Sequence, residues 1–276
     1  MASYPFATIE PNVGVVPVED ERLEKLAKIV ETDKIVPATV KFLDIAGLVK
    51  GAAEGEGLGN KFLAHIREVD LIVHVLRDFH SADVLVTGVD PKSDFETVKT
   101  ELDLADLEHP DAPPFSAKPV LFVVNIDEKD IKKTATIEAA YPGWEVVAIC
   151  AKMETDLIEF SRQERRAYLK EQGLSDTGLN RLVKKAYDKL GLVSFLTAGK
   201  KEVRAWTVKK GTLAPDAAGV IHTDFKKGFI KANVVSYSDF IDAPGWQSAR
   251  AKGLIRSEGK DYQFAGDEVV EFAVAT

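Results

Sequence analysis

The chain has 276 residues, of which 45% are hydrophobic and 29% are charged, and its formal net charge is −8. This composition is that of an ordinary soluble protein of one or two domains with ample material for a core. The single cysteine, Cys150, excludes an internal disulfide and fits a reducing compartment. No signal peptide is readable, and no stretch approaches the roughly 20 apolar residues of a membrane span, so we expect a cytoplasmic protein without membrane contact.

The first part of the chain alternates between helical and strand patterns. Residues 19–31 predict a short amphipathic helix whose inward face carries Leu23, Leu26, Ala27 and Val30. Further helices are expected at 59–69, 156–171 and 179–190, and strands at 40–45, 71–76, 120–125 and 146–150. Strands separated by helices predict a doubly wound, mostly parallel sheet that is covered by helices on both faces.

After Gly191 this alternation gives way to short strands and turn residues. Strands are expected at 201–208, 229–235 and 269–274. We therefore predict two domains, residues 1–192 and residues 193–276, of which the second is a small α+β domain.

Asp44 and Gly47 form the strongest candidate site in the sequence. Asp44 ends a predicted strand, where its carboxylate can hold Mg²⁺ through water, and Gly47 lets a backbone N–H approach a γ-phosphate without a Cβ in the way. A bare Asp-x-x-Gly also describes many turns. Here a strand precedes it, and further glycines and an amphipathic helix follow it. This combination is typical of the second phosphate-sensing loop of a nucleoside triphosphatase.

A second group of candidate residues follows the predicted strand LFVVN, which Asn125 ends. GTPases place Asn-Lys-x-Asp here, and their aspartate grips the guanine edge, whereas this chain has Ile126 at the lysine position and Glu128 at the aspartate position. Glu128 is one methylene longer than aspartate, so we expect the bidentate guanine contact to be lost. We expect Ile126 to offer an apolar surface to the base, and Asn125 and nearby carbonyls to reach N7 and the 6-amino group of adenine.

Cys150 and Ala151 follow the next predicted strand, at the place where backbone amides of GTPases meet the base. We expect them to complete the base site. The side chain of Cys150 is interpreted as a buried small hydrophobic group rather than a redox group. Lys152 either lies along the base or is solvated.

The run from Asp44 to Asn60 resembles the Obg-related GTPases, and most closely their Obg-like ATPase (YchF) branch. The resemblance extends over nearly the whole chain through the segments 4–17, 59–68, 195–208, 221–230 and 257–263. It implies a P-loop-type nucleotide-binding domain followed by a C-terminal TGS domain with a β-grasp fold. It also implies slow ATP hydrolysis in a switch protein, in which Thr8 and Asp44 reach Mg²⁺ beside the γ-phosphate. Without the resemblance, Thr8 would be an ordinary strand threonine.

The sequence departs from that family in several places. No G-x-x-x-x-G-K-[ST] motif occurs in it, and the family's first strand and phosphate-binding loop would lie immediately upstream of Tyr4. The helical insertion expected near 108–118 is nearly absent, and the segment 83–91 is short and lacks the family's histidine. Leu48 is not one of these departures: it differs from Ras-type GTPases, which orient the attacking water with a glutamine at this position. We expect the sequence to record less than the natural polypeptide.

The charge distribution is compatible with an RNA partner. Residues 193–276 contain 12 basic and 10 acidic residues, and the stretch 200–231 contains 8 basic and 3 acidic ones. Such a cluster is either a solvated β-surface or a contact for the phosphate backbone of the ribosome or another RNA. The leading hypothesis is a ribosome-associated ATPase that uses Mg²⁺ and prefers ATP over GTP. The alternative is a non-catalytic ribosome- or RNA-binding module, and a GTPase is disfavoured by Ile126 and Glu128.

Overall fold

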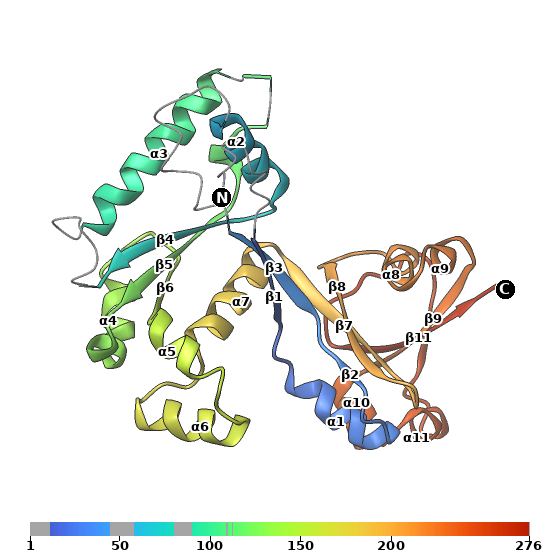
Figure 1. Ribbon diagram of the computed structural model, residues 1–276. Helices are drawn as coiled ribbons and strands as arrows, with labels where there is room; N and C mark the ends of the chain where they lie inside the picture. The colour runs from blue at the N-terminus through green and yellow to red at the C-terminus, as the bar shows by residue number, and fades with distance from the viewer. Residues whose placement is uncertain (1–11, 45–57, 80–89, 109, 112, 276) are drawn as a thin grey trace, which may run out of the picture. The chain divides into compact units, whose positions relative to one another are not determined.

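The computed structural model describes residues 12–44, 58–79, 90–108, 110–111 and 113–275 and shows a mixed α/β fold (Figure 1). The chain forms two compact units. The first unit comprises Met1–Gly14 and Lys41–Ala186, and the second comprises Val15–Val40 and Tyr187–Thr276. Among the described helices, none has the length and apolar character that crossing a bilayer requires.

The first unit is built on a parallel sheet. Its strands, in spatial order, are β4 (Ile72–Asp78), β5 (Val120–Ile126) and β6 (Val146–Ile149). The central strand β5 is buried on both faces, which explains its unbroken apolar run VLFVV. Leu121 and Val123 enter one hydrophobic core, and Phe122 and Val124 enter the other, because successive side chains of a strand point to opposite faces.

Helices cover both faces of this sheet. They are α2 (Leu58–Glu68), α3 (Pro91–Glu108), α4 (Thr134–Ala139), α5 (Ala151–Asp156), α6 (Arg162–Glu171) and α7 (Gly178–Lys189). Two short 3-10 helices, η2 (Phe115–Ala117) and η3 (Glu128–Lys133), lie between them in the chain. Leu182 of α7 packs in the core that holds Leu121, whereas Met153 of α5 and Leu169 of α6 pack in the opposite core.

Two of these helices differ from the sequence predictions. The helix expected at 156–171 is interrupted, because Ser161 and Glu164 form a capping box that starts α6 as a helix of its own. Helix α3 was not predicted, since its apolar residues do not gather on a single helical face.

The second unit contains a six-stranded mixed sheet. Its strands, in spatial order, are β10 (Arg256–Glu258), β9 (Phe229–Ser236), β11 (Glu268–Val274), β7 (Leu192–Ala198), β8 (Val203–Lys209) and β2 (Ile35–Val36). The pairs β11–β7 and β2–β8 are parallel, and the other pairs are antiparallel. Its helices are α1 (Glu21–Val30), α8 (Ala214–Ile221), α9 (Thr223–Lys227), α10 (Tyr237–Asp242) and α11 (Trp246–Ala251).

Each face of this sheet has its own core. Leu196 of β7 and Val269 of β11 pack with residues of α1, α10 and α11 on one face. Phe195 of β7 and Val234 of β9 pack with residues of α8 on the other face. The second unit is therefore a three-layer structure with the sheet in the middle.

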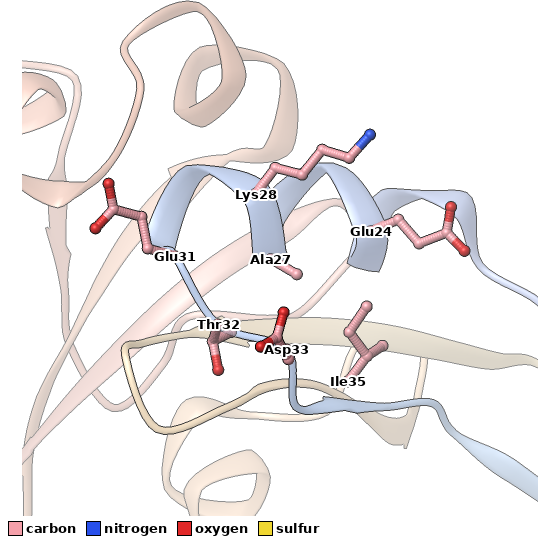
Figure 2. Close-up of a pocket in the computed structure, with 7 residues that line it drawn as sticks. All are labelled: Glu24, Ala27, Lys28, Glu31, Thr32, Asp33 and Ile35. Carbon is pink, nitrogen blue, oxygen red and sulfur yellow. The ribbon is translucent and has the colours of Figure 1, made fainter.

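The second unit contains a segment, Val15–Val40, that the predicted division at residue 192 assigns to the first domain. Leu26 of α1 is fully buried in the core that contains Leu196, and Ile35 of β2 pairs with Val203 of β8. Figure 1 shows α1 and β2 beside β8 and α10, and Figure 2 shows the corner where α1 leads into β2. The amphipathic pattern of α1 predicts a buried face, but it carries no information about which core that face enters.

Glu268 is a carboxylate buried in the second unit, with 1% of its surface exposed. It accepts hydrogen bonds from the backbone N–H groups of Ala265 and Gly266, both at 2.7 Å, and from the Tyr262 hydroxyl at 3.1 Å. Two causes raise the pKa of Tyr262 to about 12 from the ordinary value of 10.0. The larger cause is burial of the hydroxyl, and the second is the negative charge of Glu268. Because the folded-state pKa is the higher one, this tyrosine stabilises the fold below pH 10 and loses that contribution as the pH rises through 12.

Replacing Glu268 should destabilise the second unit strongly. The change Glu268→Ala leaves three donors without their acceptor, so we expect the free energy of unfolding to fall by about 2–5 kcal/mol. Glu268→Gln keeps one acceptor oxygen and should lose less. Urea unfolding at neutral pH measures both, with Glu271→Ala on the exposed side of the same strand as the control. Equal stability of the Glu268→Ala and Glu271→Ala proteins would contradict this role.

Candidate functional site

The carboxyl ends of the parallel strands β5 and β6 bring the predicted base-site residues together. Asn125 is the penultimate residue of β5 and lies in register with Arg77 of β4 and Ile149 of β6. Cys150 directly follows β6, and Ala151 begins α5. Ligands of parallel α/β sheets bind at this edge, because the loops after the strands meet there.

A hydrogen bond joins the two loops that follow these strands. The backbone N–H of Ala151 donates to Oδ1 of Asn125 at 3.0 Å. This contact orients the carboxamide, since its oxygen is engaged by the protein. The NH₂ group of Asn125 is then the part of the side chain that can donate to a ligand acceptor.

An ion pair joins the same two loops a second time. Lys152 Nζ lies 2.8 Å from Glu128 Oε2, and both side chains are exposed. The hydrogen bond to Glu128, together with its negative charge, raises the pKa of Lys152. The sequence allows Lys152 either to lie along a base or to be solvated. In the structure it is exposed and binds Glu128, the residue at the GTPase aspartate position.

Two of the predicted residues turn their side chains into the core. Ile126 is 2% exposed and Cys150 is 3% exposed, and both belong to the hydrophobic cluster that contains Val124 and Met153. We expected the side chain of Ile126 to offer an apolar surface to a base, but in the structure this side chain is buried in the core. At this edge of the sheet, Ile126 and Cys150 can contact a ligand only through their backbone groups.

Asp44 is the last residue of β3 (Thr39–Asp44), which pairs with β1 (Asn12–Pro17) in a two-stranded sheet. Phe42, two residues earlier, packs against the core that contains Leu121. The other two predicted phosphate-site residues, Thr8 and Gly47, lie outside the described residues.

Asp44 is the one predicted Mg²⁺ ligand that the structure describes. Among the described residues, no group of three or more His, Cys, Asp or Glu side chains is arranged to hold a metal alone. Mg²⁺ in nucleotide sites is bound by one or two side chains together with substrate phosphates and water. A single carboxylate at a strand end, such as Asp44, is sufficient for that mode.

A half-buried carboxylate, Glu154, which was not among the predicted site residues, holds α5 in place. Oε1 of Glu154 accepts a hydrogen bond from the backbone N–H of Gly178 at 2.6 Å, at the start of α7. Burial raises the pKa of Glu154. Because α5 begins at Ala151, this contact also fixes the helix that carries Ala151 and Lys152.

A surface depression of about 570 Å³ lies elsewhere, on the second unit. It is lined by α1, by the turn after it and by Ile35 of β2 (Figure 2). None of the predicted nucleotide-site residues lines it, so it is not the site described above.

Comparison with known proteins identifies the family. Residues 1–126 match the family model MMR_HSR1, described as a 50S ribosome-binding GTPase, and residues 192–275 match YchF-GTPase_C, described as a protein of unknown function. The ribosome-binding ATPase YchF of Bacillus subtilis is 39% identical, with 98% of this chain and 91% of that protein covered. The chain belongs to the YchF family of Obg-like ATPases. This confirms the resemblance found in the sequence.

Further YchF proteins and solved structures agree. The ribosome-binding ATPase YchF of Haemophilus influenzae is 40% identical over the same shares of both chains, 98% and 91%. The structure of the Schizosaccharomyces pombe YchF GTPase matches with a TM-score of 0.82 and 30% identity, covering 99% of this chain and 90% of that one. A GTP-binding protein from Pyrococcus horikoshii, at 17% identity and a TM-score of 0.54, shares the fold alone.

These comparisons show a mixed α/β fold with a GTPase domain followed by a C-terminal domain. They also show a difference in length. The alignment with the Bacillus subtilis YchF protein runs over 333 residues, which exceeds the 276 residues of this chain. Parts of that relative therefore have no counterpart here.

Removing the side chain of Asn125 should loosen the junction between the two loops. Asn125→Ala deletes the acceptor of the Ala151 N–H, so amide hydrogen exchange at Ala151 should accelerate by about three- to tenfold. Asn125→Asp keeps an acceptor oxygen and is the matched control, in which protection should persist. If Ala151 exchanges equally fast in all three proteins, the hydrogen bond does not hold the loops together.

Proposed function

We propose that this YchF-family protein is a ribosome-associated switch that binds ATP in preference to GTP and hydrolyses it slowly with the help of Mg²⁺. The observation that carries the proposal is the doubly linked pair of loops, Asn125 to Ala151 and Glu128 to Lys152, at the carboxyl edge of the sheet. Relatives about 40% identical over nearly the full chain are named ribosome-binding ATPases, which supports the same activity here.

The phosphate end of the site is assigned to Thr8, Asp44 and Gly47. Thr8 and Asp44 would hold Mg²⁺, which when bound neutralises charge on the β- and γ-phosphates. Gly47 would donate its backbone N–H to the γ-phosphate, where a side chain would block the approach. Leu48 has no polar group, so the attacking water must be positioned by another group. The slow turnover that we propose is consistent with that lack.

The base end of the site supports adenine over guanine. The NH₂ group of Asn125 can donate to N7, which both purines share, so it gives affinity rather than selectivity. Guanine selectivity needs a carboxylate that accepts from N1–H and from the 2-amino group. Glu128 is one methylene too long for that geometry, and Lys152 already binds it at 2.8 Å. A backbone carbonyl at Ile126 or Cys150 can accept from the 6-amino group, which only adenine has.

The finer architecture belongs to the same proposal. The parallel sheet β4–β5–β6, with helices on both faces, supports a P-loop-type, doubly wound nucleotide domain within residues 1–192. In residues 193–276, the hairpin β7–β8 is followed by α8, which packs on one face of a mixed sheet. That arrangement supports the assignment of this region as a TGS domain of the β-grasp type.

Exposed lysines in the C-terminal part of the second unit support a ribosomal or other RNA partner. Lys209, Lys210 and Lys227 are exposed, and none of the three forms an ion pair within the described part of the chain. Lys226 differs, because it forms an ion pair with Asp216. Unpaired surface lysines can neutralise phosphates without first breaking an internal contact.

Nucleotide selectivity is the first test. We expect the dissociation constant for ATP to be about ten- to a hundredfold lower than that for GTP, because the N1–H and 2-amino donors of guanine lack a carboxylate acceptor here. Lys152→Ala releases Glu128 and should narrow the gap, whereas Lys129→Ala, a nearby exposed lysine paired with Asp127, should not. Calorimetric titration in the presence of Mg²⁺ measures the dissociation constants of all three proteins for both nucleotides. Equal affinities or a preference for GTP in the unaltered chain would refute the assignment of the base site.

The alternative function is that of a non-catalytic ribosome-binding module. A chain that binds ribosomes but neither binds nor hydrolyses ATP would support this alternative. The variant Asp44→Ala distinguishes these two functions. It should abolish turnover in an ATPase and change nothing in a binding module.

The RNA contact can be tested by charge reversal. Changing Lys209, Lys210 and Lys227 to glutamate should weaken ribosome binding at least tenfold at moderate salt and flatten its salt dependence. The control protein carries the same reversal at the exposed residues Lys25, Lys28 and Lys260 of the same unit. Sedimentation with purified ribosomes at two salt concentrations gives both quantities. Equal weakening in the two proteins would indicate a general charge effect and no specific surface.

A further inference from the structure

The chain leaves the first unit after Gly14 and returns to it at Lys41. Between these points, residues Val15–Val40 belong to the second unit. We call this segment the tether. In the sequence it separates the two proposed phosphate-sensing segments, since Thr8 precedes it and Asp44 follows it.

Apolar burial anchors the tether in the second unit. Leu23 and Leu26 of α1 are 2% and 0% exposed, and they lie in the same cluster as Leu196 and Val269 of the central strands. Ala38, near the end of the tether, is also buried in this cluster. The tether therefore forms part of the core of the second unit, where close packing resists gradual deformation.

Polar contacts anchor the tether as well. The backbone N–H of Val203 in β8 donates to the carbonyl of Lys34 at 2.9 Å, next to the parallel pairing of β2 with β8. Lys34 also forms an ion pair with Glu202 at 2.6 Å. At the other end of α1, Arg22 Nη1 donates to the carbonyl of Gly266 at 2.6 Å.

The two ends of the tether are joined to each other and continue into paired strands. The backbone N–H of Val18 donates to the carbonyl of Ala38 at 2.8 Å. From this neck, β1 runs back along the chain towards Thr8, and β3 runs forward to Asp44. The boundary between the units falls inside both strands. The paired strands β1 and β3 therefore lead from the segments of the first unit directly into the tether.

We propose that the tether transmits the nucleotide state of the first unit to the RNA-binding surface of the second. The inference rests on the proposed function and adds a route to it. The tether stays docked on the second unit, so a shift of the strand ends at the phosphate site is passed on to the sheet to which β2 belongs. The coupling is reciprocal, so ribosome binding must change ATP affinity by the same factor as ATP changes ribosome affinity.

The first test weakens the docking of the tether. For the unaltered chain, the ratio of ribosome dissociation constants with ADP and with a non-hydrolysable ATP analogue should differ from one by about fivefold or more. In Leu26→Ala this ratio should fall towards one while ATP affinity is retained. Val234→Ala, a buried residue in the core on the opposite face of the same sheet, is the matched control and should keep the ratio. A retained ratio in a Leu26→Ala protein whose α1 amides exchange faster would overturn the proposal.

The second test does not depend on a destabilising change. Ile35→Cys combined with Val203→Cys places two thiols on paired positions of β2 and β8, and oxidation fixes the tether to the sheet. The proposal predicts that the oxidised protein keeps the full ratio, and loss of the ratio would overturn it. A ratio of one in the unaltered chain would instead refute the switch function itself, before the tether is considered.

Discussion

The burial of β5 on both faces is the constraint on which the candidate site depends. Its run of apolar residues from Val120 to Val124 can be buried only between two helical layers, and that burial fixes the parallel register with β4 and β6. The register brings Asn125 and Ala151 to one edge, where their hydrogen bond closes the loop junction. Polar chemistry at the edge is thus positioned by apolar packing beneath it.

The second unit shows a different use of packing. Its sheet is completed by β2 and covered by α1, although both lie far from the C-terminal strands in the sequence. In the sequence, these elements lie between Thr8 and Asp44, two residues of the proposed phosphate site. The packing of this segment in the second unit is the physical basis of the coupling that we propose.

Much of this organisation was predictable from the sequence. The strands of the parallel sheet and the amphipathic helix α1 follow from period and burial, and the meeting of Asn125 with Ala151 follows from parallel strand ends. The destination of α1 was not predictable, because an apolar stripe does not name its partner. The orientation of the Ile126 side chain could not be predicted, because a residue at a strand end can face either the ligand or the core. The pairing of Lys152 with Glu128 depends on loop geometry that residue types do not encode.

The central claim is that ATP binds at the carboxyl edge of β5 and β6. The most direct measurement is the change in amide chemical shifts during titration with ATP and Mg²⁺. The account predicts saturable shifts of the Asn125 side-chain NH₂ and the Ala151 backbone amide, with much smaller shifts at equal concentrations of GTP. Shifts confined to other regions, such as the depression beside α1, with Asn125 and Ala151 unchanged, would contradict it.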